Sequence, residues 1–138
     1  MKLIIHTDGG SRGNPGPGAS GFVFLDDNGD IVLDDGEFLG STTNNEAEYK
    51  ALIMALETLL TFNNLSKVES LIVKLDSKLV VEQVLGNWKV KEERLKPLVD
   101  KVRLLLVKLP FPYQLKHVPR AENHLADAKV NEILDSVE

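Results

Sequence analysis

The sequence predicts an α/β fold in which an antiparallel meander of strands is followed by a parallel pair. Two strand-like runs, residues 19–25 and 31–39, flank Asn28-Gly29, a dipeptide typical of tight β-hairpins. Farther along, strand-like and helix-like segments alternate, which is typical of parallel strands joined by right-handed crossovers. Ligands of such sheets bind beyond the carboxyl ends of the parallel strands, so we expect functional residues there.

Length and composition restrict the class of protein. The chain has 138 residues, 43% of them hydrophobic, and this length suits a single domain spanning residues 1–138 with its own core. The absence of cysteine excludes disulfide bonds, thiolate zinc sites and cysteine nucleophiles. The opening residues MKLIIHTD lack the apolar core of a signal peptide, and no apolar run is long enough to span a bilayer. We expect a cytoplasmic monomer with no membrane contact and no obligate protein partner.

Charge is distributed unevenly along the chain. The net charge of −5, taken alone, argues against a nucleic-acid partner. However, residues 1–60 hold ten acidic and three basic side chains, whereas residues 86–120 hold nine basic and three acidic ones. A basic segment of this kind suits a phosphate backbone, and it equally suits solvated helix faces.

The first strand-like run ends in a carboxylate. Residues 3–7 are mostly apolar or β-branched, Asp8 follows them, and a segment rich in glycine and proline comes next. Because Asp-Gly is a common turn signal, a simple turn-forming role for Asp8 is the alternative. The loop at residues 13–18 lacks the Gly-Lys-Ser/Thr ending of a nucleotide P-loop and leads into a strand, so we interpret it as a rigid turn.

A helix is predicted over residues 47–60, with its start marked by a capping box between Thr43 and Glu46. Following the buried stripe back along this helix by steps of three and four places Glu48 on the core-facing side. A carboxylate there is costly unless it caps, pairs or binds a metal ion. The alternative to a metal ligand is that Asn45 caps the helix and Glu48 completes a second capping box.

The fourth strand repeats the arrangement of the first. Residues 70–75 form a strand-like run that ends directly in Asp76, and residues 78–85 follow as a helix closed by Gly86. In the predicted sheet Asp8 and Asp76 lie side by side. Two like charges at neighbouring strand ends repel each other, and the usual remedies are a raised pKa or a bound cation.

The last third of the chain continues the alternation. Residues 93–109 have the apolar spacing of an amphipathic helix that Pro110 stops, and residues 111–118 form a fifth strand-like run. A polar loop then leads to a final helix from residue 125, with Asp127 near its start. An aspartate in a first turn also suits the helix dipole, so that role is the alternative for Asp127.

Four carboxylates therefore occupy unusual positions: Asp8, Glu48, Asp76 and Asp127. Carboxylates without thiolates or a set of imidazoles suit Mg²⁺ or Mn²⁺ rather than zinc. Such sites bind two ions ~4 Å apart and use them for in-line phosphoryl chemistry.

Four segments resemble the type 1 ribonuclease H family. They are TDGGSRGNPGPG, TTNNEAEY, the strand ending LDS with its KLVV continuation, and HVPRAENHLAD, and the match covers essentially the whole chain in order. The resemblance implies an α/β, ribonuclease H-like fold with a five-stranded mixed sheet, three strands antiparallel and two parallel, and helices on both faces. The four carboxylates fall on the positions of the family's metal ligands.

The resemblance further implies a metal-dependent endonuclease that hydrolyses the RNA strand of RNA–DNA hybrids to 5′-phosphate and 3′-hydroxyl ends. Two Mg²⁺ ions, replaceable by Mn²⁺, would activate the attacking water and stabilise the leaving 3′-oxygen. Asp8 would be shared by both ions, with Asp76 and Asp127 on opposite sides. Glu48 would also accept a hydrogen bond from the 2′-hydroxyl, the group that distinguishes RNA from DNA.

Other positions match the family's substrate contacts and its mobile loop. The substrate-contacting positions are Gly10, Ser11, Asn14, Thr43, Asn44 and Asn45, and they act mostly on sugar and phosphate, which predicts weak sequence preference. His117 has the spacing from Asp127 at which the family places a loop histidine for product release or proton transfer. His124 in the same loop is the alternative, and His6 is interpreted as structural.

Three departures from the family pattern indicate the compact branch of the family that lacks a lysine-rich protrusion, or handle. They predict weaker binding of hybrids. Lys78 replaces a common glutamine, Lys129 replaces an often apolar residue, and the segment after Trp88 is too short for a lysine-rich protrusion. The competing hypotheses are a catalytically silent nucleic-acid-binding module on the same fold and a different metal-dependent phosphoesterase. A plain α/β domain with capping acids would need four coincidences of placement.

Overall fold

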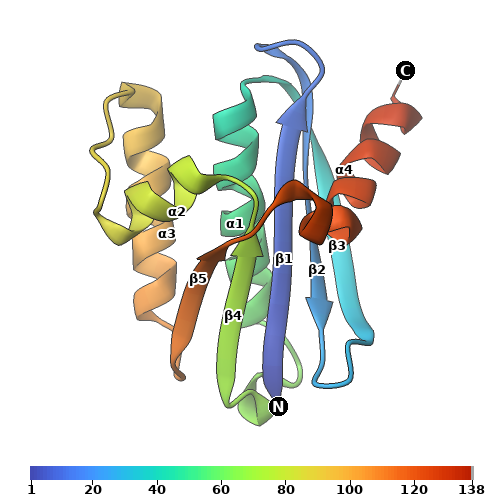
Figure 1. Cartoon of the computed structure of the whole chain (residues 1–138), viewed down its shortest axis with the longest axis vertical. Helices are drawn as coiled ribbons and strands as arrows, with labels where there is room; N and C mark the ends of the chain where they lie inside the picture. Colours follow the sequence, from blue (N-terminus) through green and yellow to red (C-terminus); the bar gives the residue numbers. More distant parts are fainter. Residues whose placement is uncertain (138) are drawn as a thin grey trace.

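Five strands form a mixed sheet in the order β3-β2-β1-β4-β5 (Figure 1). The computed structural model describes residues 1–137. The strands are β1 (Lys2–Ser11), β2 (Gly16–Leu25), β3 (Ile31–Thr42), β4 (Ser70–Leu75) and β5 (Tyr113–His117). The pairs β1–β2 and β2–β3 are antiparallel, whereas β1–β4 and β4–β5 are parallel. The predicted meander and parallel pair are confirmed.

Helices cover both faces of this sheet (Figure 1). They are α1 (Asn44–Leu60), α2 (Lys78–Leu85), α3 (Lys96–Val107) and α4 (His124–Ser136), together with short 3₁₀ turns η1 (Leu65–Lys67), η2 (Glu93–Leu95) and η3 (Arg120–Asn123). The first three helices lie on one face, and α4 packs against β1, β2 and β3 on the other. Within residues 1–137, no helix has both the length and the apolar character needed to cross a membrane.

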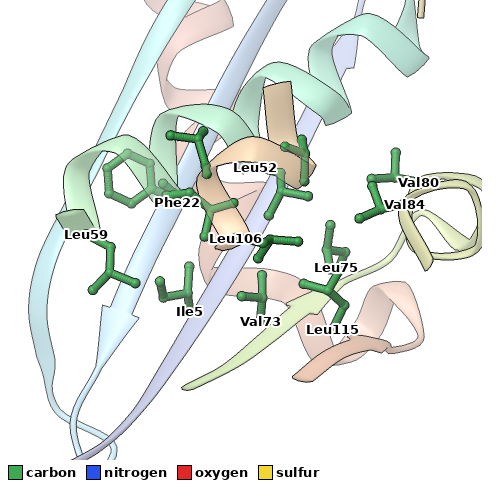
Figure 2. Close-up of a cluster of buried hydrophobic side chains, with 14 of the residues drawn as sticks. Ile5, Phe22, Leu52, Leu59, Val73, Leu75, Val80, Val84, Leu106 and Leu115 are labelled. Carbon is green, nitrogen blue, oxygen red and sulfur yellow. The ribbon is translucent and has the colours of Figure 1, made fainter. Parts of the chain in front are cut away.

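The main core lies between the sheet and helices α1 to α3 (Figure 2). Strand alternation directs Leu3 and Ile5 of β1 to this face, where both belong to the same core cluster as Leu52 and Leu59 of α1. Each such fully buried side chain contributes about 1.5–3 kcal/mol. A second, smaller cluster of Ala19, Val130 and Leu134 lies beneath α4.

Several predicted boundaries are wrong. β1 does not end at Asp8 but runs on to Ser11, because residues 8–11 still pair with β2. β3 runs past residue 39 to Thr42, which pairs with Gly16. β2 begins at Gly16 rather than at residue 19, since the absence of a side chain at Gly18 leaves room for Thr42 on the neighbouring strand. The predicted helix over residues 93–109 is divided into η2 and α3. Pro97 lies in the first turn of α3, where its missing N–H costs no intrahelical hydrogen bond. The fifth strand spans Tyr113–His117, and the loop after it contains η3.

Gly9 is a point of close approach between β1 and α1. A Cβ atom at Gly9 would lie 2.2 Å from the carbonyl carbon of Ala47 and 2.5 Å from the backbone nitrogen of Glu48. The backbone N–H of Gly9 also donates a hydrogen bond to Oε1 of Glu48 at 3.3 Å. This contact holds the first turn of α1 against the strand that carries Asp8.

Gly9→Ala is expected to reduce the free energy of unfolding by about 1–3 kcal/mol, because backbone atoms must shift to admit the methyl group. Urea denaturation measures this loss. Gly10→Ala is the matched control, since its Cβ would meet nothing closer than 3.9 Å. Equal losses in the two variants would contradict the close approach at Gly9.

Candidate metal-binding and catalytic site

Three carboxylates converge at the point where the parallel pairing of β1 and β4 ends, although β1 itself continues past Asp8 to Ser11. One carboxylate oxygen from each of Asp8, Glu48 and Asp76 lies within 4.8 Å of the others. Asp8 and Asp76 directly follow Thr7 and Leu75, which are paired in the parallel register of β1 and β4. The prediction that Asp8 and Asp76 lie side by side is confirmed.

Glu48 takes no part in capping α1. Thr43 is the N-cap: its hydroxyl oxygen accepts from the N–H of Glu46 at 3.2 Å, and Oε1 of Glu46 accepts from the N–H of Thr43 at 3.3 Å. The alternative in which Asn45 caps the helix is therefore wrong, because Asn45 already lies inside it. Oε2 of Glu48 is buried and, among residues 1–137, has no hydrogen-bond partner. A buried acceptor of this kind is costly unless a ligand satisfies it.

Mutual repulsion and burial shape the electrostatics of the site. Burial, followed by the charge of Asp76, raises the pKa of Asp8 from 3.8 to about 7. Burial and the charge of Asp8 raise the pKa of Glu48 well above its usual range. The folded protein therefore opposes ionisation of these carboxyls, and a cation among them would remove the opposition.

Asp127 reaches the same cleft from α4, outside the cluster of three. Its negative charge contributes to the raised pKa of Asp8. Nη2 of Arg120 lies 3.9 Å from Oδ1 of Asp127, and Nδ2 of Asn131 donates to Oδ2 at 3.4 Å. Asp127 is thus placed in the first turn of a helix, as the dipole argument expects, and also faces the other carboxylates.

The residues of the cleft fit a hard divalent cation. The donor set consists of carboxylate oxygens, and Oε2 of Glu48 supplies a buried oxygen that accepts no hydrogen bond from residues 1–137. Mg²⁺ and Mn²⁺ prefer such oxygen ligands, whereas structural zinc prefers sulfur and imidazole. Within residues 1–137, no positive group balances the charges of Asp8 and Glu48 well enough to lower their pKa values, because both pKa values are raised.

The predicted substrate-contacting residues lie beside the carboxylates. Gly10, Ser11, Asn44 and Asn45 line the same cleft, while Asn14 and Thr43 line a neighbouring hollow with Arg94. Oδ1 of Asn44 accepts hydrogen bonds from the N–H and the hydroxyl of Ser11, at 2.9 and 3.1 Å. The N–H of Asn44 donates to Oδ1 of Asn14 at 3.0 Å. These polar groups are therefore ordered before any ligand binds.

The loop between β5 and α4 places an arginine, rather than a histidine, in the cleft. Among the described residues that line it, Arg120 is present and His117 and His124 are not. The placement of both histidines in this loop is wrong, because His117 is the last residue of β5 and His124 is the first residue of α4. The sequence analysis missed Arg120, because an exposed arginine in a polar loop carries no signal of its own. Its only sequence cue is its position seven residues before Asp127.

Two of the departures from the family pattern have local structural partners. Nζ of Lys78 lies 5.9 Å from the centroid of the Trp88 ring, a cation–π arrangement. The aliphatic stem of Lys129 packs over Gly21, and its Nζ reaches Oδ1 of Asp34 at 3.6 Å. A lysine is accommodated on this face of α4 because its stem is buried while its charge is paired.

Comparison with known proteins assigns the family. A family model described as "Reverse transcriptase-like" matches residues 6–133. Ribonuclease HI from Halobacterium salinarum is 42% identical over 97% of this chain, which spans 65% of that protein's length. The crystal structure of RNase H1 from H. salinarum matches with a TM-score of 0.90 and 40% identity, covering 99% of both chains. The chain belongs to the type 1 ribonuclease H family.

A further ribonuclease H structure extends the comparison. LC11-RNase H1, in complex with an RNA/DNA hybrid, matches with a TM-score of 0.89 and 41% identity over 98% of both chains. The predicted ribonuclease H-like fold is confirmed. The carboxylate cluster of this ribonuclease H family member is thus carried on a scaffold shared with relatives of known structure.

Proposed function

We propose that this protein is a metal-dependent endonuclease that hydrolyses the RNA strand of RNA–DNA hybrids to 5′-phosphate and 3′-hydroxyl ends. The observation that carries the proposal is the convergence of carboxylates from β1, α1, β4 and α4 on one open, polar cleft. The family supports it, and so does the hybrid bound to the related LC11 enzyme. Residues 1–138 would act as one catalytic domain, in the cytoplasm, as a monomer without a protein partner.

Four carboxylates would hold the metal ions. Asp8, Glu48, Asp76 and Asp127 would together bind two Mg²⁺, replaceable by Mn²⁺, with Asp8 shared between them. When bound, such ions lower the pKa of an attacking water and stabilise the leaving 3′-oxygen of the cleaved phosphodiester. The carboxylates must be ionised to bind the metal ions. Their mutual repulsion in the folded protein favours cation binding.

The remaining polar groups of the cleft would orient the substrate. Glu48 accepts a hydrogen bond from the 2′-hydroxyl of the RNA strand, which a DNA strand lacks. Asn44 and Ser11, which are hydrogen-bonded to each other, contact sugar and phosphate. Gly10 and Asn45, which line the same cleft, make further contacts of this kind. Contacts of this kind position a strand without reading its bases, so sequence preference is expected to be weak.

Strand selectivity tests the proposed function directly. In Mg²⁺, the purified protein is expected to cleave the RNA strand of a labelled RNA–DNA hybrid and to leave the matched DNA duplex and single-stranded RNA intact. Binding of the hybrid without cleavage in either Mg²⁺ or Mn²⁺ would instead indicate a silent binding module. Cleavage of the DNA duplex would indicate a phosphoesterase of another class.

The role predicted for His117 has a structural competitor in Arg120. Because Arg120 lines the cleft beside Asp127, Arg120→Ala is expected to reduce kcat on the hybrid by about a hundredfold, the usual cost of losing one electrostatic contact to reacting groups. His117→Ala is expected to change kcat by less than about twofold, because a residue outside the cleft would not take part in proton transfer. Steady-state kinetics of both variants decide between them. A larger loss of kcat in His117→Ala than in Arg120→Ala would assign this catalytic role to His117.

A further inference from the structure

Asn123 is completely buried although it is polar and lies at the start of a helix. Asparagine is a favoured N-cap because its side chain accepts a hydrogen bond from the first turn. Asn123 makes no such hydrogen bond with α4. Its Nδ2 donates instead to the carbonyl oxygen of Thr7 at 2.8 Å, and its Oδ1 lies 3.0 Å from Nδ1 of His6. The helix therefore forgoes a cap worth about 1 kcal/mol in favour of a contact with β1.

The chemistry of the partners fixes the orientation of this amide. The carbonyl oxygen of Thr7 only accepts hydrogen bonds, so it must face Nδ2 of Asn123. Oδ1 of Asn123 also only accepts, so Nδ1 of His6 carries the proton and donates it. His6 is 7% exposed and Asn123 is 0% exposed, so the pair is shielded from competition by water.

This contact joins the elements that carry two of the four carboxylates. Thr7 immediately precedes Asp8 on β1, and Asn123 lies four residues before Asp127, about one helical turn. In Figure 1 the segment that leads into α4 passes the end of β4 and crosses β1 below its arrowhead. Asp8 and Asp127 are far apart in sequence, and the hydrogen bonds of Asn123 hold their elements together next to the cleft.

The helix α4 also makes apolar contacts. Ala126 is buried in its first turn, and Val130 and Leu134 pack with Ala19 of β2. Ile133 packs over Gly36 of β3, where a Cβ would come within 2.4 Å of its Cδ1. This small cluster is separate from the main core. Hydrophobic packing thus anchors the middle of α4 on β2 and β3, whereas at its start, where Ala126 is also buried, the hydrogen bonds of Asn123 tie it to β1.

We propose that His6 and Asn123 form a positioning pair that fixes Asp127 relative to Asp8 for binding of divalent cations. Neither side chain lines the cleft, so the pair acts through the backbone of β1 and the first turn of α4. The inference rests on the proposed function, because it assigns these two carboxylates to one metal site. It adds two residues that touch neither substrate nor metal.

Binding of Mn²⁺ to the purified protein, measured by isothermal titration calorimetry without nucleic acid, tests this pair. Asn123→Ala is expected to raise the Kd for Mn²⁺ by about tenfold or more, the usual cost of losing a group that orients a metal ligand. In hybrid cleavage the same variant should lose kcat and need more Mg²⁺ for half-maximal activity, with KM nearly unchanged. His6→Phe keeps a buried ring without the donor, and it is expected to weaken Mn²⁺ binding in the same direction.

Ile133→Val is the matched control, because it loosens the packing of α4 on β3 but leaves the hydrogen bonds of Asn123 in place. It is expected to lower Tm without changing the Kd for Mn²⁺. Wild-type Mn²⁺ affinity in both Asn123→Ala and His6→Phe would overturn the pair, even in a protein that cleaves hybrids. If Asn123→Ala fails to fold, His6→Phe alone decides. A wild-type protein that binds Mn²⁺ but leaves the hybrid intact would overturn the proposed function, while weaker Mn²⁺ binding in the variants would still support the pair.

Discussion

Asp8→Asn is expected to abolish cleavage of RNA–DNA hybrids, with a loss on the order of 10³-fold or more, as expected when a shared ligand of a metal site is removed. Asp8 interacts with each of the other three carboxylates, since Asp76, Glu48 and Asp127 all affect its pKa. The amide is nearly the same size as the carboxylate but carries no charge, so it cannot balance a second cation. The loss should therefore appear in kcat rather than in the affinity for the hybrid.

Single-turnover cleavage of a labelled hybrid, together with hybrid binding measured in Ca²⁺ or without metal, separates these two effects. Asp30→Asn is the matched control, because it makes the same chemical change at an exposed hairpin position remote from the cleft. It is expected to retain the wild-type rate. Cleavage that persists in Asp8→Asn would show that the reaction occurs at another site.

The metal-free protein is expected to lose stability as the pH rises from about 4 to 7. The folded-state pKa of Asp8 is raised from 3.8 to about 7, chiefly by burial and then by the charge of Asp76. In this window the unfolded chain releases the proton that the folded protein retains, so the free energy of unfolding falls by about 1.4 kcal/mol per pH unit. Above pH 7 the penalty is constant at about 4 kcal/mol. Glu48, with its raised pKa, adds to the same trend.

Thermal melts in EDTA at pH 5 and pH 8 measure this penalty. At pH 8, Asp8→Asn is expected to melt higher than the wild type by on the order of 10 °C, because the buried charge is gone. Mg²⁺ should raise the Tm of the wild type by binding the folded state only, and should raise that of Asp8→Asn much less. Equal Tm values for the two proteins at pH 8 in EDTA would show that Asp8 carries no such penalty.

Local sequence signals predicted most of the elements. The Asn28-Gly29 hairpin, the capping box of Thr43 with Glu46, the strand at Ser70–Leu75 and the helix closed by Gly86 are all present as predicted. Each depends on interactions between residues near one another in the chain, such as a turn geometry, a cap or a repeating apolar pattern. The juxtaposition of Asp8 and Asp76 also followed, because parallel strands bring their carboxyl ends to one edge.

Tertiary structure alone decided the rest. It resolved whether Glu48 caps or faces the site, since that depends on the close approach of α1 to Gly9. It also placed Arg120 in the cleft and directed Asn123 toward β1 instead of its own helix. A local pattern cannot foresee such contacts, because their partners are distant in sequence: 39 residues separate Gly9 from Glu48 and 116 separate Thr7 from Asn123. The sequence by itself determined that Asp8 and Asp76 lie side by side and that Glu48 and Asp127 lie near the starts of helices. The packing of α1 and α4 onto the sheet determined how the four carboxylates meet.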